Sequence, residues 1–348
     1  MPDTHVKTIL AADIGGTHSR FALFHLTTEA DAPLATLHLV RRTRFVTTDS
    51  ADSAHMMRLL ADTPGDDGGF FLPSSPDPVQ IDAAVFGIPG PAAVADITVP
   101  PPADALCHCP NIPWPLEGKP VAAALGGVHV RFINDFVANG FACAMLPDRI
   151  DAVPILPGEH RPLFPQAVIG AGTGLGHCLI LPGPTPVVAG AEAGHALFPF
   201  LDDEADIRRH FAKAFGTERI TGDMAVGGSA LSLLYAHYTG ETVHPHTVAP
   251  LAAKHPQTLE RMAGFYGRAV LQYVLATLPL GGVFITGGLA THLPEVLTHP
   301  AFIAELREKN PMSRNLGDIP LLHARSNAAG LWGSAACAVL GTGVSTFS

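Results

Sequence analysis

A carboxylate followed by a glycine-rich turn is the first feature of this chain that could do chemistry. Asp13 ends the apolar run ILAAD, and Gly15, Gly16 and Thr17 come directly after it. Glycines let backbone N–H groups approach phosphate oxygens closely, and a carboxylate suits a hydrated Mg²⁺ ion. Alternating apolar residues flank the turn, so residues 7–24 predict a β-hairpin whose tip could hold phosphate oxygens.

A second turn repeats this design between residues 166 and 181, in the sequence QAVIGAGTGLGHCLIL. Gly172, Thr173 and Gly174 lie between two apolar strands. Neither turn fits the GxxxxGK[ST] motif, and each leads into a strand where a dinucleotide fingerprint would lead into a helix. Either hairpin alone is explained by a tight turn. The pair favours phosphate binding and suggests two similar halves that face each other across a cleft.

Polar residues at the end of another strand could take part in proton transfer. The alternating segment 128–136 delivers Asn134 and Asp135 to its carboxyl end, where α/β sheets bind ligands. The alternative is that Asp135 caps the helix that follows. Glu192 and His195 lie further on, in VVAGAEAGHALFPF. They could be a metal pair, or they could belong to a loop that lies close to a ligand.

The length of 348 residues allows two domains of ordinary size. Hydrophobic residues make up 47% and charged residues 15% of the chain, which indicates a globular protein. A formal net charge of -10 argues against nucleic-acid binding. The five cysteines are an odd number and widely spread, which indicates reduced, cytosolic thiols. The group Cys107 to Cys109 has no second ligand pair, so a zinc site is not expected there.

No basic region with a following apolar segment precedes the first strand, so we expect no signal peptide and a cytoplasmic protein. The uncharged stretches 269–291 and 326–348 are interrupted by glycine, proline or small residues, and we expect buried elements there instead of membrane spans. Helical periodicity is found at 51–60, 208–215, from 229, at 259–278 and at 328–340.

A strand at 282–286 ends in Gly287 and Gly288, directly before a helix start. Backbone amides at such a junction could contact a phosphate or a nucleoside. A last strand is expected at 319–323.

The motifs ADIGGT, FINDF, IGAGTGLG, AEAGH and GGVFITGGL, in this order, resemble the bacterial glucokinase family of the actin/hexokinase/Hsp70 superfamily. The matches run from about Val6 to Leu340. The resemblance implies an α/β protein with the two-domain actin-like ATPase (ribonuclease H-like) fold, mixed sheets and an interdomain cleft. It places the smaller domain at 1–146, completed by the C-terminal helix 327–348, and the larger domain at 147–326.

The resemblance also implies roles for single residues. Asp135 would be the general base for the sugar 6-hydroxyl, with Asn134 beside it on the sugar. Glu192 and His195 would bind sugar hydroxyls, and Asp13 would help to place Mg²⁺ through water. The ATP-binding residues would be Gly15, Gly16, Thr17, Gly172, Thr173, Gly174, Gly287 and Gly288.

One departure concerns a further sugar-binding glutamate, which the family carries in a stretch like HVSAERVLSGPGL. Glu218 in TER invites the match. Aligning RITGDMAVGGSAL without a gap instead places Asp223 there, and this also fits the separation from His195. A shorter carboxylate would alter the contact and leaves the choice of hexose open.

We interpret the sequence as an ATP-dependent hexose kinase, in the first place a glucokinase that makes glucose 6-phosphate with Mg²⁺. We expect a homodimer with a small-molecule hexose substrate and no nucleic-acid or membrane partner. The alternatives are a kinase for another hexose or amino sugar, and a catalytically silent sugar-binding regulator. Asp135 argues against the regulator, because binding alone needs no base. An actin-like or chaperone ATPase would need a partner-binding domain, for which the length leaves little room.

Overall fold

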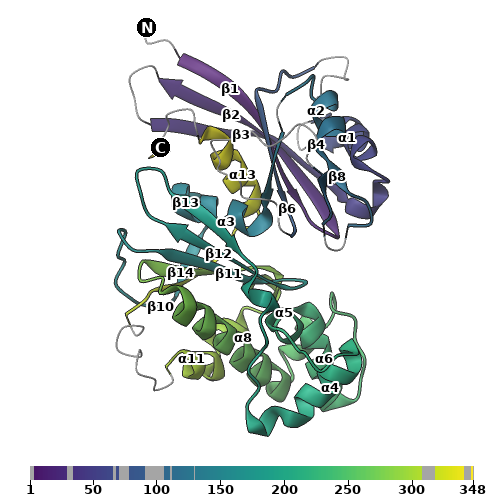
Figure 1. Ribbon diagram of the computed structural model, residues 1–348, viewed down its shortest axis with the longest axis vertical. Helices are drawn as coiled ribbons and strands as arrows, with labels where there is room; N and C mark the ends of the chain where they lie inside the picture. Colours follow the sequence, from purple (N-terminus) through teal and green to yellow (C-terminus); the bar gives the residue numbers. More distant parts are fainter. Residues whose placement is uncertain are drawn as a thin grey trace. The chain divides into compact units, whose positions relative to one another are not determined.

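The computed structural model describes residues 4–29, 34–65, 68–69, 78–90, 106–109, 112–128, 130–307, 318–340 and 346–347. The chain divides into two compact units (Figure 1). Unit 1 comprises Met1–Ile150, Pro184–Gly190 and Ser326–Ser348, and unit 2 comprises Asp151–Gly183 and Ala191–Arg325.

Unit 1 is built on a six-stranded mixed sheet with the order β16-β3-β2-β1-β6-β9. Strands β1, β2 and β3 are antiparallel, whereas β6 and β9 run parallel to β1. Ile14 pairs with Ser19 at the tip of β1 and β2, so the first predicted hairpin is confirmed. The strands are β1 (Thr4–Ile14), β2 (His18–Glu29), β3 (Leu34–Val46), β6 (Ala83–Ile88), β9 (Val130–Asn134) and β16 (Thr346–Phe347).

Helices cover both faces of this sheet (Figure 1). Ile9, Leu10, Ala11 and Ala12 of β1 are all buried, which requires cover on each side. Helix α13 packs on β1, β6 and α3, while α1 and α2 pack together over the apolar cluster that includes Leu10. The helices are α1 (Ser53–Asp62), α2 (Gly118–Ala124), α3 (Asp135–Met145) and α13 (Ala329–Val339).

Small residues let α13 approach α3 closely. A Cβ atom at Gly333 would overlap the carbonyl oxygen of Ala138 and lie 2.9 Å from the backbone nitrogen of Ala142. The Ser334 hydroxyl, one residue on, donates to the Ala12 carbonyl oxygen at 3.2 Å. Glycine and alanine in α13 therefore fix α3, and with it Asp135, against the central strand.

Unit 2 contains a second six-stranded mixed sheet with the order β10-β15-β14-β11-β12-β13. Strands β11 and β12 are antiparallel with Ala171 opposite Leu175, which confirms the second predicted hairpin. Strand β14 runs parallel to β11 and spans the predicted residues 282–286. The strands are β10 (Ala152–Leu156), β11 (Gln166–Ala171), β12 (Leu175–Leu181), β13 (Val187–Ala191), β14 (Gly282–Thr286) and β15 (Leu321–Ala324).

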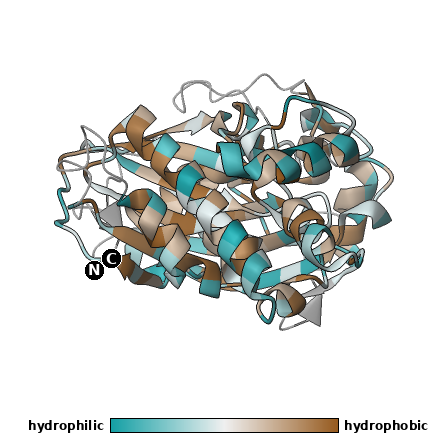
Figure 2. Ribbon diagram, turned by 90° about the horizontal axis from the view of Figure 1, so that it is seen from below, coloured by the Kyte–Doolittle hydropathy of each residue, from teal (hydrophilic) through white to brown (hydrophobic). Residues whose placement is uncertain are grey.

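The helices of unit 2 are amphipathic where they reach the surface, and Figure 2 shows them striped with hydrophilic and hydrophobic residues. In α4, for example, Ile207 and Phe211 are buried whereas Arg208 is half exposed. None of the helices in the described part of the chain combines the length and apolar composition that a membrane crossing needs. The helices are α4 (Ala205–Phe215), α5 (Gly222–Ala225), α6 (Gly228–Thr239), α7 (Ala249–Ala252), α8 (Pro256–Thr277), α9 (Gly288–His292), α10 (Glu295–Thr298) and α11 (Pro300–Leu306).

A buried ion-pair network joins helices α8 and α11 of unit 2 to the turn before α4. The Glu204 carboxylate is fully buried and accepts from the Arg268 guanidinium at 2.7 and 3.0 Å and from Arg261 at 2.8 Å. Arg268 also donates to Glu305 at 2.6 Å. Removing one partner of such a network would leave a buried charge uncompensated. The network therefore fixes α8 against α11 and the turn before α4.

Short elements complete the structure. The short strands are β4 (Pro64–Gly65), β5 (Gly68–Gly69), β7 (Leu106–Cys107) and β8 (Leu116–Glu117), and the 3-10 turns are η1 (Thr47–Asp49), η2 (Pro147–Arg149), η3 (Ala193–His195) and η4 (Asp202–Glu204).

Candidate active site

A buried tyrosine positions the glycine turns of unit 2. Tyr266 of α8 is fully buried, and burial raises the pKa of its phenol, which stays protonated. Its oxygen accepts from the Ala171 backbone N–H at 3.3 Å and donates to the Thr286 carbonyl at 3.4 Å. These residues end β11 and β14. The turns that follow both strands therefore start from one fixed point.

The turn of the second hairpin offers space where a ligand is expected. The Gly172 N–H donates to the Gly174 carbonyl at 2.8 Å, which closes the turn. A Cβ atom at Gly172 would meet no described atom within 4 Å, so a side chain there would fill open space. At Gly174 a Cβ atom would contact the Cβ of Asp223 at 3.5 Å. The turn therefore lies directly beside a carboxylate.

Two further glycine pairs surround this turn. Gly287 has φ of 94°, and a Cβ atom there would lie 2.5 Å from the Ala171 carbonyl oxygen, so only glycine fits. The Gly228 N–H, at the start of α6, donates to the Gly172 carbonyl at 3.0 Å. Gly287 and Gly288 were predicted from the sequence. Gly227 and Gly228 were missed, although a double glycine before a helix is a readable signal.

Two carboxylates of unit 2 lie beside His195, one on the side of each ring nitrogen. Its Nε2 atom lies 3.6 Å from the Glu192 carboxylate, and its Nδ1 atom lies 3.6 Å from the Asp223 carboxylate. These separations are too long for hydrogen bonds, and hydroxyl groups of a ligand could bridge them. Glu192 and His195 are more than half exposed, whereas Asp223 is 25% exposed. The group can thus receive a ligand rich in hydroxyls.

The backbone holds this group together by close contacts between distant segments. Gly222, at the start of α5, donates its N–H to the Ala196 carbonyl at 2.9 Å. Leu197 forms a β-bridge with Thr221, whose hydroxyl donates to the Asp223 carboxylate. A Cβ atom at Gly194 would overlap the Leu175 carbonyl oxygen. Turn η3, helix α5 and strand β12 therefore form one platform.

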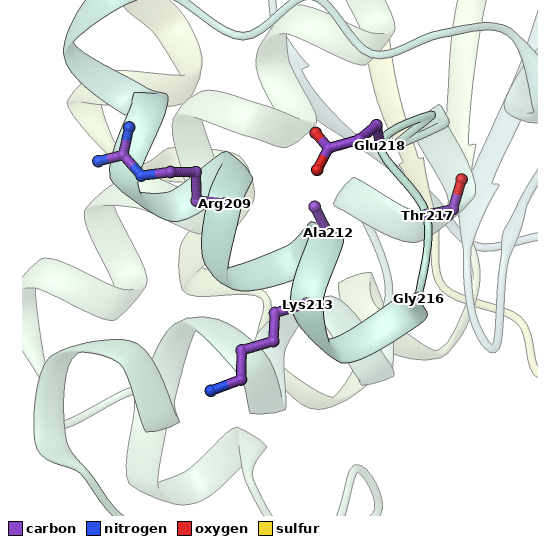
Figure 3. A pocket seen from close by; sticks show the side chains of 6 residues that line it. All are labelled: Arg209, Ala212, Lys213, Gly216, Thr217 and Glu218. Carbon is purple, nitrogen blue, oxygen red and sulfur yellow. The ribbon is translucent and has the colours of Figure 1, made fainter.

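Glu218 lies elsewhere in unit 2. Its side chain is 81% exposed and lies 3.6 Å from the Arg208 guanidinium. It lines a hollow of about 250 Å³ together with residues of α4 and the turn after it. Figure 3 shows its carboxylate above Ala212, while Lys213 points away from it. Of the two carboxylates considered from the sequence, the structure brings Asp223 to His195 and leaves Glu218 at the surface.

In unit 1, Asp13 lies at the carboxyl end of β1, beside the first hairpin turn. Its Oδ2 atom accepts from the Arg20 guanidinium at 2.9 Å, a partner that the sequence interpretation missed. The carboxylate is 21% exposed. A Cβ atom at Gly330 of α13 would lie 3.1 Å from its Cγ atom, so this glycine makes room for it. Asp13 is therefore a partly buried oxygen donor in a fixed position.

Asn134 and Asp135 have separate structural environments at the junction of β9 and α3. Asn134 is the N-cap, because its side-chain oxygen accepts from the N–H groups of Phe136 at 2.9 Å and Val137 at 3.2 Å. Its amide also donates to the Gly90 carbonyl at 3.0 Å. Asp135 is the first residue of the helix, and its Oδ1 atom accepts from its neighbour Phe136 at 3.0 Å. Asn134, and not Asp135, is thus the cap.

The register of the parallel strands places Asp13 and Asp135 on one edge of the sheet. Asp13 pairs with Gly87 of β6, and Asn134 of β9 pairs with Ile88, the residue after Gly87. Neighbouring strands lie about 4.8 Å apart, so the ends of β1 and β9 are separated by about 10 Å. Two carboxylates at this edge leave room for a reacting group between them.

The cysteine pair near this edge remains protonated. Burial raises the pKa of Cys109 to about 12, with smaller contributions from Cys107 and from the charge of Asp135. Burial also raises the pKa of Cys107. Within the described residues no three or more His, Cys, Asp or Glu side chains are grouped to hold a metal. Both thiols are therefore protonated near neutral pH.

Comparison with known proteins identifies the family. The family model described as Glucokinase matches residues 10–340, which include both glycine turns, Asp135 and the His195 group. The chain belongs to the glucokinase family. A glucokinase from Nostoc sp. is 26% identical over 365 residues, covering 95% of this chain and 98% of that protein. The family resemblance inferred from the motifs is thereby confirmed.

Solved glucokinase structures share the fold of this family member. A glucokinase from an Antarctic psychrotroph matches with a TM-score of 0.72 at 23% identity, over 95% of this chain and 98% of that one. A ROK family glucokinase from Streptomyces griseus, in complex with glucose and AMPPNP, matches with a TM-score of 0.59 at 18% identity, over 96% of this chain and all of that one. The expected two-domain actin-like α/β fold class is confirmed.

Proposed function

We propose that this glucokinase-family chain is an ATP-dependent hexose kinase that transfers the γ-phosphoryl group of ATP to the 6-hydroxyl of D-glucose. The observation that carries the proposal is the position of Asp135. Its carboxylate stands at the carboxyl end of β9, on the same edge as Asp13, while Asn134 satisfies the helix start. A helix start capped by its own asparagine does not need this carboxylate, whereas deprotonation of an alcohol does.

In this proposal Asp135 accepts the proton of the 6-hydroxyl as that oxygen bonds to phosphorus and the bond to the leaving ADP oxygen breaks. Asn134 lies beside Asp135 and contacts the same sugar. Glu192, His195 and Asp223 bind other sugar hydroxyls, because each carboxylate can accept from several hydroxyls and the imidazole can donate from one ring nitrogen and accept at the other. Atoms 3.6 Å apart can both reach one hydroxyl that lies beside them, at about 2.8 Å from each.

ATP is proposed to lie along the glycine turns. Gly15 and Gly172 use their own N–H groups to close the two turns. The N–H groups of Gly16, Thr17, Thr173 and Gly174, together with the two threonine hydroxyls, would then bind phosphate oxygens. Gly287 and Gly288 lie near the nucleoside. Open space at Gly172 and the forced glycine at Gly287 agree with a ligand close to the backbone. The Streptomyces griseus relative, which was solved with AMPPNP, agrees with the choice of nucleotide.

Mg²⁺ is the expected metal, with Asp13 as its partner through water. The partly buried Asp13 carboxylate fits a hard cation that keeps most of its own water ligands. Bound there, the ion would neutralise charge on the phosphate oxygens.

We further propose that units 1 and 2 correspond to the predicted domains, 1–146 with 327–348 and 147–326.

The direct test is a panel of hexoses and amino sugars assayed for ADP release. We expect D-glucose to have the highest kcat/KM. A higher value for an amino sugar would favour the alternative kinase, a possibility raised by the short side chain of Asp223. Hexose binding without ADP release from any member of the panel would indicate the sugar-binding regulator and contradict the proposal.

Replacing Asp223 with alanine tests the sugar site of unit 2. We expect hexose binding to weaken by roughly ten-fold or more, because a lost hydrogen bond to a charged group costs ~1.5–3 kcal/mol. ATP binding should be nearly unchanged. Calorimetric titration with glucose and, separately, with AMPPNP measures both.

The matched control is Glu218→Ala, which removes a carboxylate five positions earlier from an exposed surface pair. Such a pair contributes little to stability, so the variant should fold as the parent does. Glu218 is not part of the His195 group, so both affinities should match those of the parent protein. If Glu218→Ala weakened hexose binding while Asp223→Ala did not, the gap-free alignment would be wrong and the family's glutamate would be restored.

A further inference from the structure

A buried threonine directly after β3 contacts the turn of the first hairpin. Thr47 begins η1 and is fully buried, as is Ser19 of β2. His18 pairs with Val46 at the end of the β2–β3 ladder, so Thr47 is the first residue beyond the sheet. Its position brings a hydroxyl and a backbone N–H next to residues 15–19.

Both polar groups of Thr47 bind the backbone of the turn. Its hydroxyl donates to the Gly15 carbonyl at 2.6 Å, and its N–H donates to the Thr17 carbonyl at 3.0 Å. The Thr47 and Ser19 hydroxyl oxygens are 3.0 Å apart. A hydroxyl has one proton, and Thr47 uses its proton on Gly15, so Ser19 is the donor in this pair. The chain Ser19, Thr47, Gly15 is thus ordered in one direction.

These bonds have a consequence for the amides of the turn. The Thr47 contacts fix the carbonyls of Gly15 and Thr17, and the Gly15 N–H is bound to the His18 carbonyl at 2.9 Å. A turn with adjacent glycines loses much conformational freedom when it is ordered. Fixing the carbonyls also orients the peptide units between them, and their N–H groups are the ones proposed to face phosphate. An ordered turn would bind phosphate without that further loss.

We propose that Thr47 is a positioning residue for ATP, which holds the amides of the first hairpin in the conformation that binds phosphate. This inference rests on the proposed kinase function and adds to it a residue outside the turn. Thr47 has no contact with substrate in this account and acts only through residues 15–17. Ser19 supports it by donating to its hydroxyl.

Thr47→Val tests the inference, because valine keeps the shape and removes the hydroxyl. We expect the KM for ATP to rise about ten-fold and the KM for glucose to stay within two-fold of the parent value. Hydrogen exchange at the amides of residues 15–17 should become about ten-fold faster. Thr47→Ser restores the hydroxyl and should return both quantities to near the parent values. If Thr47→Val does not fold, Ser19→Ala provides the same two readouts with smaller changes.

The matched control is Thr258→Val in α8. Thr258 is also fully buried, and its hydroxyl lies 2.9 Å from the Nδ1 atom of His255. This variant should lose a similar buried hydroxyl bond without a change in the KM for ATP. A double variant provides a second check, since Ser19→Ala should add nothing to Thr47→Val once the shared partner is gone.

The outcomes separate this inference from the proposed function. An active parent protein combined with an unchanged KM for ATP in Thr47→Val would overturn the inference alone. Unchanged exchange at residues 15–17 would overturn it as well. A parent protein that neither binds AMPPNP nor releases ADP would overturn the proposed function, and with it the role of Thr47 toward ATP, even if the exchange result showed that Thr47 orders the turn.

Discussion

Asp135→Asn is expected to lower turnover by ~10²–10⁴-fold, the usual contribution of a general base. The amide keeps the shape of the side chain but cannot accept the proton of the 6-hydroxyl. Because Asn134 caps α3, the substitution should leave the helix intact. Glucose binding should therefore be retained. Steady-state kinetics gives the turnover, and calorimetric titration with glucose gives the affinity.

Asp148→Asn is the matched control for this experiment. Asp148 lies exposed in η2, shortly after α3, and its change removes the same charge from the same unit. We expect it to keep the parent turnover. If Asp135→Asn kept the parent rate as well, Asp135 would not be the base and the proposed mechanism would be wrong.

Gly333→Ala is expected to destabilise unit 1 by about 3 kcal/mol, at the upper end of the usual cost of overpacking. The added methyl group would overlap the Ala138 carbonyl oxygen and crowd the Ala142 nitrogen. Both contacts are to helix backbone, which cannot move without shifting α3. Chemical denaturation monitored by circular dichroism measures the loss in the free energy of unfolding. Since α3 carries Asp135, activity should fall even where the variant remains folded.

Gly264→Ala makes the same substitution in a helix with room for it. A Cβ atom at Gly264 in α8 would meet its nearest neighbour, a Glu305 carboxylate oxygen, at 3.9 Å. Alanine has a higher helix propensity than glycine by up to ~1 kcal/mol, so this variant should be as stable as the parent or more stable. Equal stability of the two variants would show that α3 and α13 are not closely packed at Gly333.

Local patterns in the sequence were enough for the elements that carry the candidate site. Strand alternation and turn glycines act over a few residues, and this is why both hairpins and the strand 282–286 were predicted correctly. The junction at Asn134 was also placed correctly, because a strand end followed by helical periodicity is a local signal. The alternative that Asp135 caps the helix was wrong. Either of two adjacent polar residues can cap a helix, and only the folded geometry selects Asn134.

Family membership was likewise available from the sequence, because the order of short motifs survives where overall identity is low. At 26% identity to the Nostoc glucokinase, most aligned positions differ. A glycine that lies directly against the backbone of another segment cannot be replaced by a larger residue. Gly287 and Gly194 leave no space for a Cβ atom, so the backbone itself restricts the residue type.

Contacts between distant segments were decided only by the tertiary structure. Asp223 and Glu218 are both carboxylates near helix ends, and contacts such as the bridge between Leu197 and Thr221 bring only Asp223 to His195. Glu204 and Arg268 are 64 positions apart and carry no local signal of their pairing.

The contact between Thr47 and Gly15 was also decided by the tertiary structure. The two residues are 32 positions apart, and Thr47 has no local feature that distinguishes it from other residues after a strand.

One physical reason explains why these contacts could not be predicted from the sequence. Propensity and periodicity act along the chain over a few residues, and so the sequence alone determined the strands, the turns and the family. Side-chain partners depend on which buried groups meet when the sheets and helices pack, and so only the fold decided which carboxylate joins His195 and which hydroxyl holds the first turn.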